Sequence, residues 1–168
     1  MELQERKQEL NLSKLAKFLI DSPSGLGEWY INLPFEVIPE VFIERITENY
    51  YPTTSVEEWR KLIPWLNMMP TIWNSCLIQN KEKVLAFAYG DWDPLLSHMQ
   101  IIRFSIEPKL FRVDGKFMSE ALDACRVHAR LLGVRRIYWI TCRWKTFLRK
   151  VPDQIKLADA GVLEVLNV

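Results

Sequence analysis

The sequence holds few of the side chains that usually bind metals or form disulfide bridges. Its 168 residues include 2 histidines and 3 cysteines. Cys76, Cys125 and Cys142 are widely separated and lie in apolar segments, a spacing typical of neither a zinc site nor a disulfide framework. His98 and His128 have no Asp or Cys partner at a telling spacing. We therefore expect buried, reduced thiols and no metal site.

Other features are missing as well. No apolar run approaches the roughly 20 residues of a membrane-spanning helix, so no membrane span is expected. Residues 1–6 lack the apolar core of a signal peptide, which predicts a cytoplasmic protein. The sequence contains no Walker loop, no metal-binding motif and no Ser-His-Asp set.

The composition is that of a folded domain with an uneven charge distribution. Hydrophobic residues make up 49% of the chain, which is ample for one packed core. Residues 1–100 hold 9 Lys and Arg against 14 Asp and Glu, whereas residues 101–168 hold 13 against 7. The second half can attract phosphate or an acidic partner, although an ordinary solvated surface explains the charges equally well.

The most informative stretch runs over residues 101–141. Residues 101–106 and 137–141 are short, apolar and β-branched, as buried strands are. Between them, apolar residues recur at helical spacing and Gly133 ends the helix. These apolar residues are Met118, Ala121, Leu122, Cys125, Ala129 and Leu132. A strand, helix, strand crossover of this length predicts that the two strands lie parallel.

Further strands and hairpins are predicted on both sides of this stretch. Residues 29–33 have the aromatic and β-branched bias of a strand. Residues 73–79 and 84–89 form two more strands, joined by a compact polar turn. Residues 90–94 read as a loop. A closing hairpin is expected from residues 155–157 and 162–166.

Helical signals fill most of the remaining chain. A helix is predicted over residues 39–48, and the capping box of Ser55 and Glu58 opens another. Pro64 is expected to terminate or kink that second helix. A short helix is predicted over residues 144–150.

The first 22 residues are expected to form a helical appendage, distinct from a domain over residues 28–168. Asn11 or Ser13 can cap a helix that carries Leu15, Phe18 and Leu19. Such a helix can dock onto a partner or pack on its own domain.

The loop between the strand at residues 101–106 and the following helix reads Arg112-Val113-Asp114-Gly115-Lys116-Phe117. A loop that enters a helix directs backbone N–H groups and positive helix-dipole charge at one point, which suits a pyrophosphate. The Arg112-x-x-Gly115-x-Phe117 pattern, with Pro108 before it, resembles the GNAT N-acetyltransferase superfamily, whose acyl-CoA loop is Arg/Gln-x-x-Gly-x-Gly/Ala. The order of elements over residues 28–168 is also similar.

The resemblance implies a GNAT-like α/β fold, an α+β arrangement with a mixed sheet and an extra N-terminal helix. It also implies that Arg112, Gly115 and Lys116 hold the cofactor if an acyl-CoA binds. Phe117 stands at the second Gly/Ala position, where its side chain would fill space that backbone and phosphate share. Asp114 adds a negative charge among the loop amides.

The resemblance further implies a general base and a tyrosine acid. For the base, the sequence offers only Glu107, Asp91 or Asp93. For the acid, the corresponding position falls on Leu148 or Arg149. No catalytic residue is therefore assigned.

Two functions follow. The first is a GNAT-fold protein without cofactor or catalysis, a structural or assembly component that resembles small GNAT-like proteins of short-tailed bacteriophages and can be incorporated in a virion. The second is an active acetyl-CoA-dependent N-acetyltransferase with a divergent cofactor loop. Nucleic-acid binding by the basic half of the chain ranks third. It ranks below the other two because the basic residues lack the interleaved aromatic side chains on which bases stack. These residues are Arg126, Arg130, Arg135 and Arg136.

Seven tryptophans are many for this length, and the first function predicts that some of them contact other protein chains. Those in or next to predicted loops are Trp65, Trp73, Trp92 and Trp144.

Overall fold

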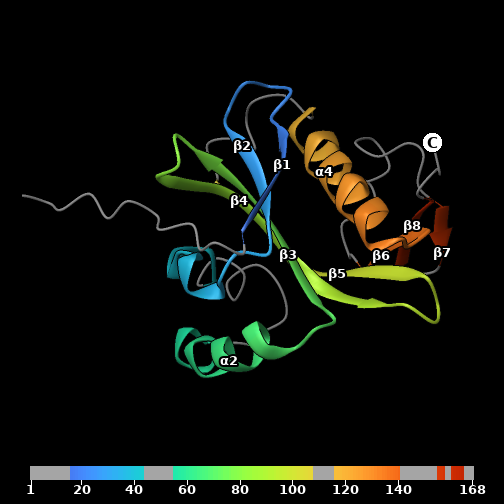
Figure 1. Cartoon of the computed structure of the whole chain (residues 1–168), viewed down its shortest axis with the longest axis horizontal. Coiled ribbons are helices and arrows are strands. Elements are labelled where there is room, and N and C mark those ends of the chain that lie inside the picture. The colour runs from blue at the N-terminus through green and yellow to red at the C-terminus, as the bar shows by residue number, and fades with distance from the viewer. Residues whose placement is uncertain (1–15, 44–54, 108–115, 141–154, 158–159, 165–168) are drawn as a thin grey trace, which may run out of the picture.

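Helices cover both faces of one mixed β-sheet in the computed structural model of the protein (Figure 1). The structure describes residues 16–43, 55–107, 116–140, 155–157 and 160–164. The described strands lie in the order β1-β2-β3-β4-β5-β6-β8-β7. They are β1 (Lys17–Asp21), β2 (Glu28–Ile31), β3 (Ile72–Gln79), β4 (Lys83–Asp93), β5 (His98–Ile106), β6 (Arg136–Ile140), β7 (Ile155–Leu157) and β8 (Ala160–Glu164).

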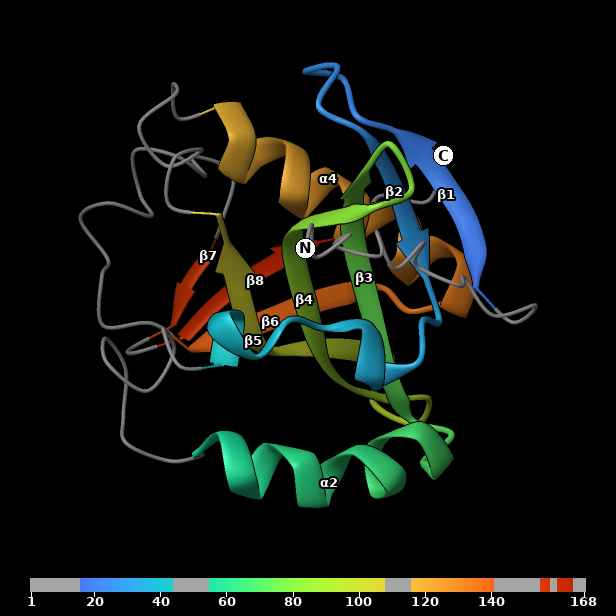
Figure 2. The same ribbon diagram turned by 90° about the vertical axis from the view of Figure 1, so that its left-hand side faces the viewer.

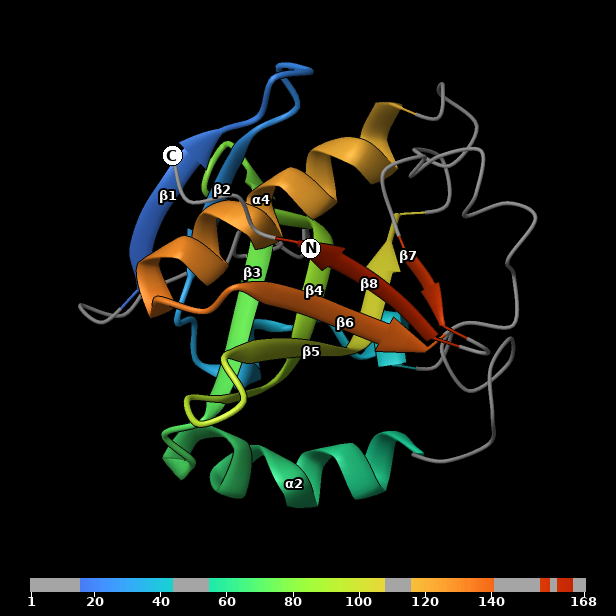
Figure 3. The same ribbon diagram turned by 90° about the vertical axis from the view of Figure 1, so that its right-hand side faces the viewer.

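The helices form a layer on each side of the sheet. Helix α4 (Lys116–Leu132) packs on one face, whereas α2 (Val56–Met68) and the 3-10 helix η1 (Phe35–Val37) lie on the other (Figures 1 and 3). None of the helices in the described residues is long and apolar enough to cross a membrane. Because helices pack on both faces of the sheet, each face has its own hydrophobic core.

The two cores differ in composition. On the α4 side, small residues of the helix such as Ala121, Ala124 and Ala129 pack against β3, β4 and β5. On the α2 side, Trp59 of the helix packs edge-on or tilted against Phe35, Phe87 and Tyr89. Burial of this apolar surface is the main favourable term in folding.

Several predictions made from the central stretch are confirmed. Strands β5 and β6 pair in parallel, with α4 as the crossover between them. Gly133 ends α4 with φ +73°, and Val134 N donates to Ala129 O at 3.0 Å, as in a helix end closed by a left-handed residue. The β3–β4 hairpin and the β7–β8 pair are also present.

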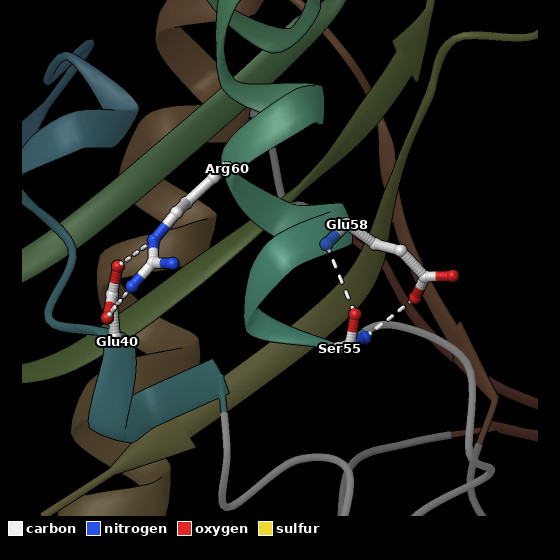
Figure 4. A network of polar contacts seen from close by, with 4 residues as sticks. All are labelled: Glu40, Ser55, Glu58 and Arg60. Atoms are coloured by element: carbon white, nitrogen blue, oxygen red, sulfur yellow. Dashed lines mark hydrogen bonds and ion pairs between the residues drawn. The ribbon is translucent and has the colours of Figure 1, made fainter.

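The predicted capping box opens α2 (Figure 4). Ser55 Oγ accepts from Glu58 N at 3.2 Å, and Ser55 N donates to Glu58 Oε2 at 2.7 Å. Arg60 forms a bidentate ion pair with Glu40, with Nε–Oε1 at 2.5 Å and Nη2–Oε2 at 2.8 Å. The hydrogen bonds from Arg60 lower the pKa of Glu40. Glu40 begins the helix predicted over residues 39–48, which is described as far as residue 43. Pro64 does not end α2.

Contacts made by the last turn of α2 explain why the helix continues past Pro64. Leu66 is buried there, and Asn67 Oδ1 accepts from Phe35 N at 3.0 Å while Asn67 Nδ2 donates to Glu36 at 2.8 Å. These tertiary contacts outweigh the one helical hydrogen bond that proline removes.

The predicted N-terminal helix is wrong for Phe18 and Leu19, which lie in strand β1; residues 1–15 are outside the described part. β1 pairs antiparallel with β2, so it belongs to the sheet rather than to an appendage. Residues 22–27 form the hairpin turn between β1 and β2, in which Gly25 has φ +73°. Long-range pairing therefore overrides the local helical spacing.

A buried carboxylate from α4 holds that turn. Glu120 accepts from Ser24 Oγ at 2.6 Å, from Trp29 Nε1 at 3.1 Å and from Ser22 Oγ. Glu120 is only 6% exposed. A buried carboxylate needs several donors, and these contacts supply them.

Two more boundaries differ from the sequence predictions. Residues 90–93, predicted as a loop, continue β4 because they pair with β5 as far as Asp93 and His98. β8 begins at Ala160, so the last hairpin turn is shorter than expected. The helix predicted over residues 144–150 is outside the described residues.

The cysteines and tryptophans follow the expectations in part. Cys76 and Cys125 are buried and unbridged, and burial raises the pKa of both thiols, that of Cys125 to about 12. Trp73 lies in β3 as a core residue, and Trp92 lies in β4 and packs against the α4-side core. Trp65 is half-exposed on α2. Cys142 and Trp144 are outside the described residues.

Candidate functional site

Strands β5 and β6 run together for only part of their length. Their parallel register joins His98 with Arg136 and ends at Ile101 with Trp139. Beyond that point β5 keeps its pairing with β4, whereas β6 keeps its pairing with β8. Figures 2 and 3 show β5 running beside β6 at first and then turning away from it. In the described residues, the second half of β5 thus has a paired edge toward β4 and no strand on its other edge.

A β-bulge lies where the two strands separate. Tyr89 pairs with Arg103 but Gly90 pairs with Ile101, so Ile102 is an extra residue on β5. A bulge bends its strand and increases the local twist. The bend in β5 therefore accounts for the gap that opens between β5 and β6.

Gly90 is the residue that makes room for this bulge. A Cβ on Gly90 would lie 1.7 Å from Gln100 O and 3.1 Å from Ile102 N. No side chain fits at that distance, so β5 can approach β4 this closely only opposite a glycine.

The direction of the β5 backbone groups follows from the ladder. Glu107 N donates to Leu85 O at 2.8 Å, which makes this a hydrogen-bonded pair. Because such pairs alternate along an antiparallel ladder, Ser105 and Arg103 also direct their N–H and C=O groups toward β4. The backbone groups of Phe104 and Ile106 then point toward the gap. The open edge of β5 is thus a short row of hydrogen-bonding groups that an extended ligand can join.

Helix α4 begins near the same end of the gap. The chain leaves β5 at Ile106 and enters α4 at Lys116, and the first turn of α4 lies on the same side of the molecule as the end of β5 (Figures 2 and 3). A helix start carries unpaired N–H groups and partial positive charge. The open edge and the helix start therefore favour an elongated ligand with an anionic end.

A polar surface covers the other half of β4, β5 and β6 on the α2 side. Met99 and Ile137 point into the α4-side core, so their neighbours point to the opposite face. Register places these neighbours in two rows across the three strands, and each is at least partly exposed. The rows are Asp91, Gln100 and Tyr138, followed by Asp93, His98 and Arg136.

Asp91 is the carboxylate of this surface nearest to the bulge. It follows Gly90 directly and pairs with Gln100. Its Oδ1 is buried without a hydrogen-bond partner in the described part of the chain. A buried, unpaired carboxylate oxygen is unfavourable, so a donor from a ligand would stabilise it.

The structure separates the other predicted candidates. Asp93 Oδ1 accepts from Leu95 N at 2.8 Å and Leu96 N at 3.1 Å, so this carboxylate caps the β4–β5 turn. Glu107 follows β5 at the far end of the gap, away from the bulge. Lys116, predicted as a loop residue, is the first residue of α4, whereas Arg112 and Gly115 lie outside the described residues.

His128 is a buried residue of α4. It is 1% exposed, its Nδ1 lies 3.0 Å from Ser75 Oγ, and its ring meets Trp73 edge-on at 5.6 Å. Burial lowers the pKa of His128 to about 4. The described residues contain no group of His, Cys, Asp and Glu arranged to hold a metal ion.

Sequence reasoning missed Gly90 and the bulge at Ile102. A glycine inside a strand pattern is a known sign of a bulge or a close backbone approach. The sequence predicts a loop over residues 90–94, and that prediction hides the role of Gly90.

The fold, unlike the sequence, is similar to those of known proteins. No family model and no curated protein sequence matches the chain. A point mutant of the spermidine N-acetyltransferase from Vibrio cholerae superposes with a TM-score of 0.60 at 10% identity, over 74% of this chain and 87% of that chain. A GNAT-family acetyltransferase from Desulfovibrio desulfuricans gives 0.56 at 15% identity, over 77% of this chain and 96% of that chain.

A third similar structure contains bound coenzyme A. N-acetylglutamate synthase from Neisseria gonorrhoeae, complexed with coenzyme A and N-acetylglutamate, gives a TM-score of 0.56 at 12% identity, over 76% of this chain and 32% of that chain. The chain therefore has the GNAT N-acetyltransferase fold, as its order of elements predicted. At these identities the likeness establishes the fold alone.

Proposed function

We propose that the protein binds an acyl-CoA in the gap between β5 and β6 and transfers its acyl group to an amine. The observation that carries this proposal is the open edge of β5, which begins at the bulge beside Gly90. Coenzyme A supplies an activated acyl thioester and two amide groups in its extended pantetheine arm. The gap-facing backbone groups of Phe104 and Ile106 fit such amides as a neighbouring strand would.

The remaining parts of the site have matching roles. The N–H groups at the start of α4 suit the pyrophosphate of the cofactor. The bulged backbone at Ile102 would donate to the thioester carbonyl, where negative charge develops during acyl transfer. Asp91, with its unpaired oxygen beside the bulge, would accept the proton of the attacking amine. As the nitrogen bonds to the acyl carbon, the C–S bond would break and coenzyme A would leave as a thiolate, which takes up that proton.

The binding step is tested by removing one backbone donor from the gap. Phe104→Pro deletes an N–H that points away from β4, whereas Phe104→Ala removes the same ring and keeps the N–H. We expect the Pro variant to bind acetyl-CoA about 5-fold more weakly than the Ala variant, since one hydrogen bond contributes roughly 1 kcal/mol. Isothermal titration calorimetry measures the difference. Equal affinities, or no binding by the unmodified protein, would overturn the proposal.

The transfer step is tested at Asp91. Asp91→Asn keeps the side-chain shape and removes the base, so kcat should fall by roughly 100-fold or more while the affinity for acetyl-CoA stays unchanged. Asp93→Asn is the matched control, because an amide oxygen can still cap the β4–β5 turn. Similar losses in both variants would contradict the assignment of Asp91.

A second candidate is a non-catalytic, cofactor-free assembly component, for instance of a phage virion. The sequence favours it at two positions: Phe117 stands in the first turn of α4, where close approach of a phosphate needs a small residue, and Asp114 adds a negative charge. The apolar Leu62, Trp65 and Met68, exposed on α2, suit contact with another protein chain. Calorimetry without any acyl-CoA binding, together with light scattering that shows an assembly, would favour this candidate.

A further inference from the structure

The bulge in β5 is held by a side chain from two strands away. Trp73 lies on β3 directly opposite Gly90 and is 2% exposed. Its Nε1 donates to Asp91 O at 3.0 Å and to Gln100 O at 3.2 Å. The indole thus reaches from β3 past Gly90 to the backbone of β5.

The missing side chain of Gly90 makes this contact possible. Gln100 O lies 1.7 Å from the point where a Cβ of Gly90 would stand, so this carbonyl is directed over Gly90. Trp73 belongs to the α4-side core, and its N–H meets the carbonyl there. A backbone carbonyl inside a sheet needs a hydrogen-bond donor, and the indole N–H supplies one to Gln100 O.

The direction of Gln100 O also sets the direction of the next N–H. The C=O of Gln100 and the N–H of Ile101 belong to one planar peptide unit and point in opposite directions. By holding Gln100 O over Gly90, Trp73 fixes that peptide unit at the last pair between β5 and β6. The bulged residue Ile102 follows immediately.

The Trp73 ring is itself fixed from the α4 side. The His128 ring meets it edge-on, with centroids 5.6 Å apart, and Ser75 Oγ lies 3.0 Å from His128 Nδ1. Both Ser75 and His128 are fully buried, so the indole has little freedom to move. The contacts run from α4 through Trp73 to the β5 backbone.

We propose that Trp73 is a positioning residue that locks the bulge of β5 against Gly90 and so holds the gap and its backbone donors in place for the acyl thioester. We call the hydrogen bonds from Trp73 Nε1 to Asp91 O and Gln100 O the lock. The lock belongs to the fold, whereas its effect on acyl transfer rests on the proposed function. Trp73 contacts neither substrate nor cofactor in this account and acts only through the β5 backbone.

The lock is tested without any ligand by comparing two tryptophan variants. Trp73→Phe keeps an aromatic ring and removes the N–H. Trp29→Phe is the matched control, because Trp29 is buried in the same core and its Nε1 donates instead to Glu120, at the β1–β2 turn. Amide hydrogen exchange of residues 100–103, corrected for global stability, should be at least about 10-fold faster in Trp73→Phe and unchanged in Trp29→Phe, since one hydrogen bond is lost at the bulge. Equal exchange in the two variants would overturn the lock.

The functional part is tested by kinetics with acetyl-CoA and an amine acceptor. Trp73→Phe should lower kcat about 10-fold with less than about 3-fold change in KM, whereas Trp29→Phe should retain the kcat of the unmodified protein. If Trp73→Phe shows faster amide exchange at the bulge but an unchanged kcat, Trp73 holds the bulge but does not affect acyl transfer. Absence of acyl-CoA binding by the unmodified protein would refute the proposed function and with it the catalytic role of Trp73, while hydrogen exchange still decides the lock.

Discussion

The carbonyl oxygen of Gln100 lies 1.7 Å from the point where a Cβ of Gly90 would stand. This relationship connects one glycine with the whole candidate site, because the same close approach allows the bulge at Ile102 and the separation of β5 from β6. The site therefore depends on a residue that carries no functional group.

The first prediction concerns Gly90→Ala. The added methyl cannot fit beside Gln100 O, so β4 and β5 must move apart, and we expect a loss of unfolding free energy of more than about 2 kcal/mol. Gly25→Ala is the comparison: its Cβ would have open space, and the strain of φ +73° should cost about 1 kcal/mol. Urea unfolding measures both. A Gly90→Ala variant as stable as Gly25→Ala would contradict the close approach.

The second prediction concerns the buried carboxylate of Glu120. Glu120→Ala leaves Ser22, Ser24 and Trp29 without their acceptor and should cost about 2 to 4 kcal/mol. Asp123→Ala, in the exposed ion pair with Arg126 on the same helix, should change stability by less than about 1 kcal/mol. Thermal or urea unfolding of the two variants distinguishes them, and similar losses would argue against Glu120 as the tie between α4 and the β1–β2 turn.

These two sites also show what the sequence can and cannot predict. The capping box of Ser55 and Glu58 and the end of α4 at Gly133 are local signals, and both are confirmed. The strand β1 depends on pairing with β2 and on a turn held by Glu120, which is more than ninety residues away along the chain. No local pattern contains that contact, so the apolar spacing around Phe18 was interpreted as a helix.

The candidate site also combines features that the sequence predicts with features that only the structure shows. The strand, helix, strand order around α4 follows from periodicity, and the resemblance of this order to the GNAT superfamily predicted the fold. The bulge requires Trp73, Gly90 and Gln100 on three neighbouring strands, and only their register brings them together. Asp91 was a candidate because it is acidic, but its unpaired oxygen beside the bulge is visible only in the structure.

The third prediction concerns the pH dependence of stability. Burial lowers the pKa of His128 from 6.5 to about 4, so the native state stays neutral down to about pH 4 while the unfolded state gains a proton below about pH 6.5. Between these values the unfolded state binds more protons, and the free energy of unfolding falls as the pH falls. The loss from this group is at most about 3 kcal/mol and is complete near pH 4.

His128→Gln tests this interpretation, since glutamine does not titrate. The variant should be less stable at pH 7, because the contacts with Ser75 and Trp73 are disturbed, and its stability should fall less between pH 6.5 and 4. Urea unfolding at several pH values gives both quantities. An unchanged pH slope in the variant would show that another group causes the acid sensitivity.

The last prediction concerns the loop before α4. Helix α4 begins at Lys116, so Phe117 occupies its first turn and Asp114 comes shortly before it. Loop amides can hold a diphosphate only if it approaches the backbone closely, and a large side chain or a carboxylate there opposes that approach.

Replacing both residues, Phe117→Gly with Asp114→Gly, should therefore tighten acetyl-CoA binding. Each recovered charge-assisted hydrogen bond contributes roughly 1.5 to 3 kcal/mol, so a gain of about 10-fold or more is expected in titration calorimetry. Asp123→Gly supplies the control, because it places a glycine at an exposed position of the same helix, away from its first turn. If the double variant is folded and binds acetyl-CoA no better than the unmodified protein, Phe117 and Asp114 do not limit binding. These two residues then no longer support the non-catalytic assembly role.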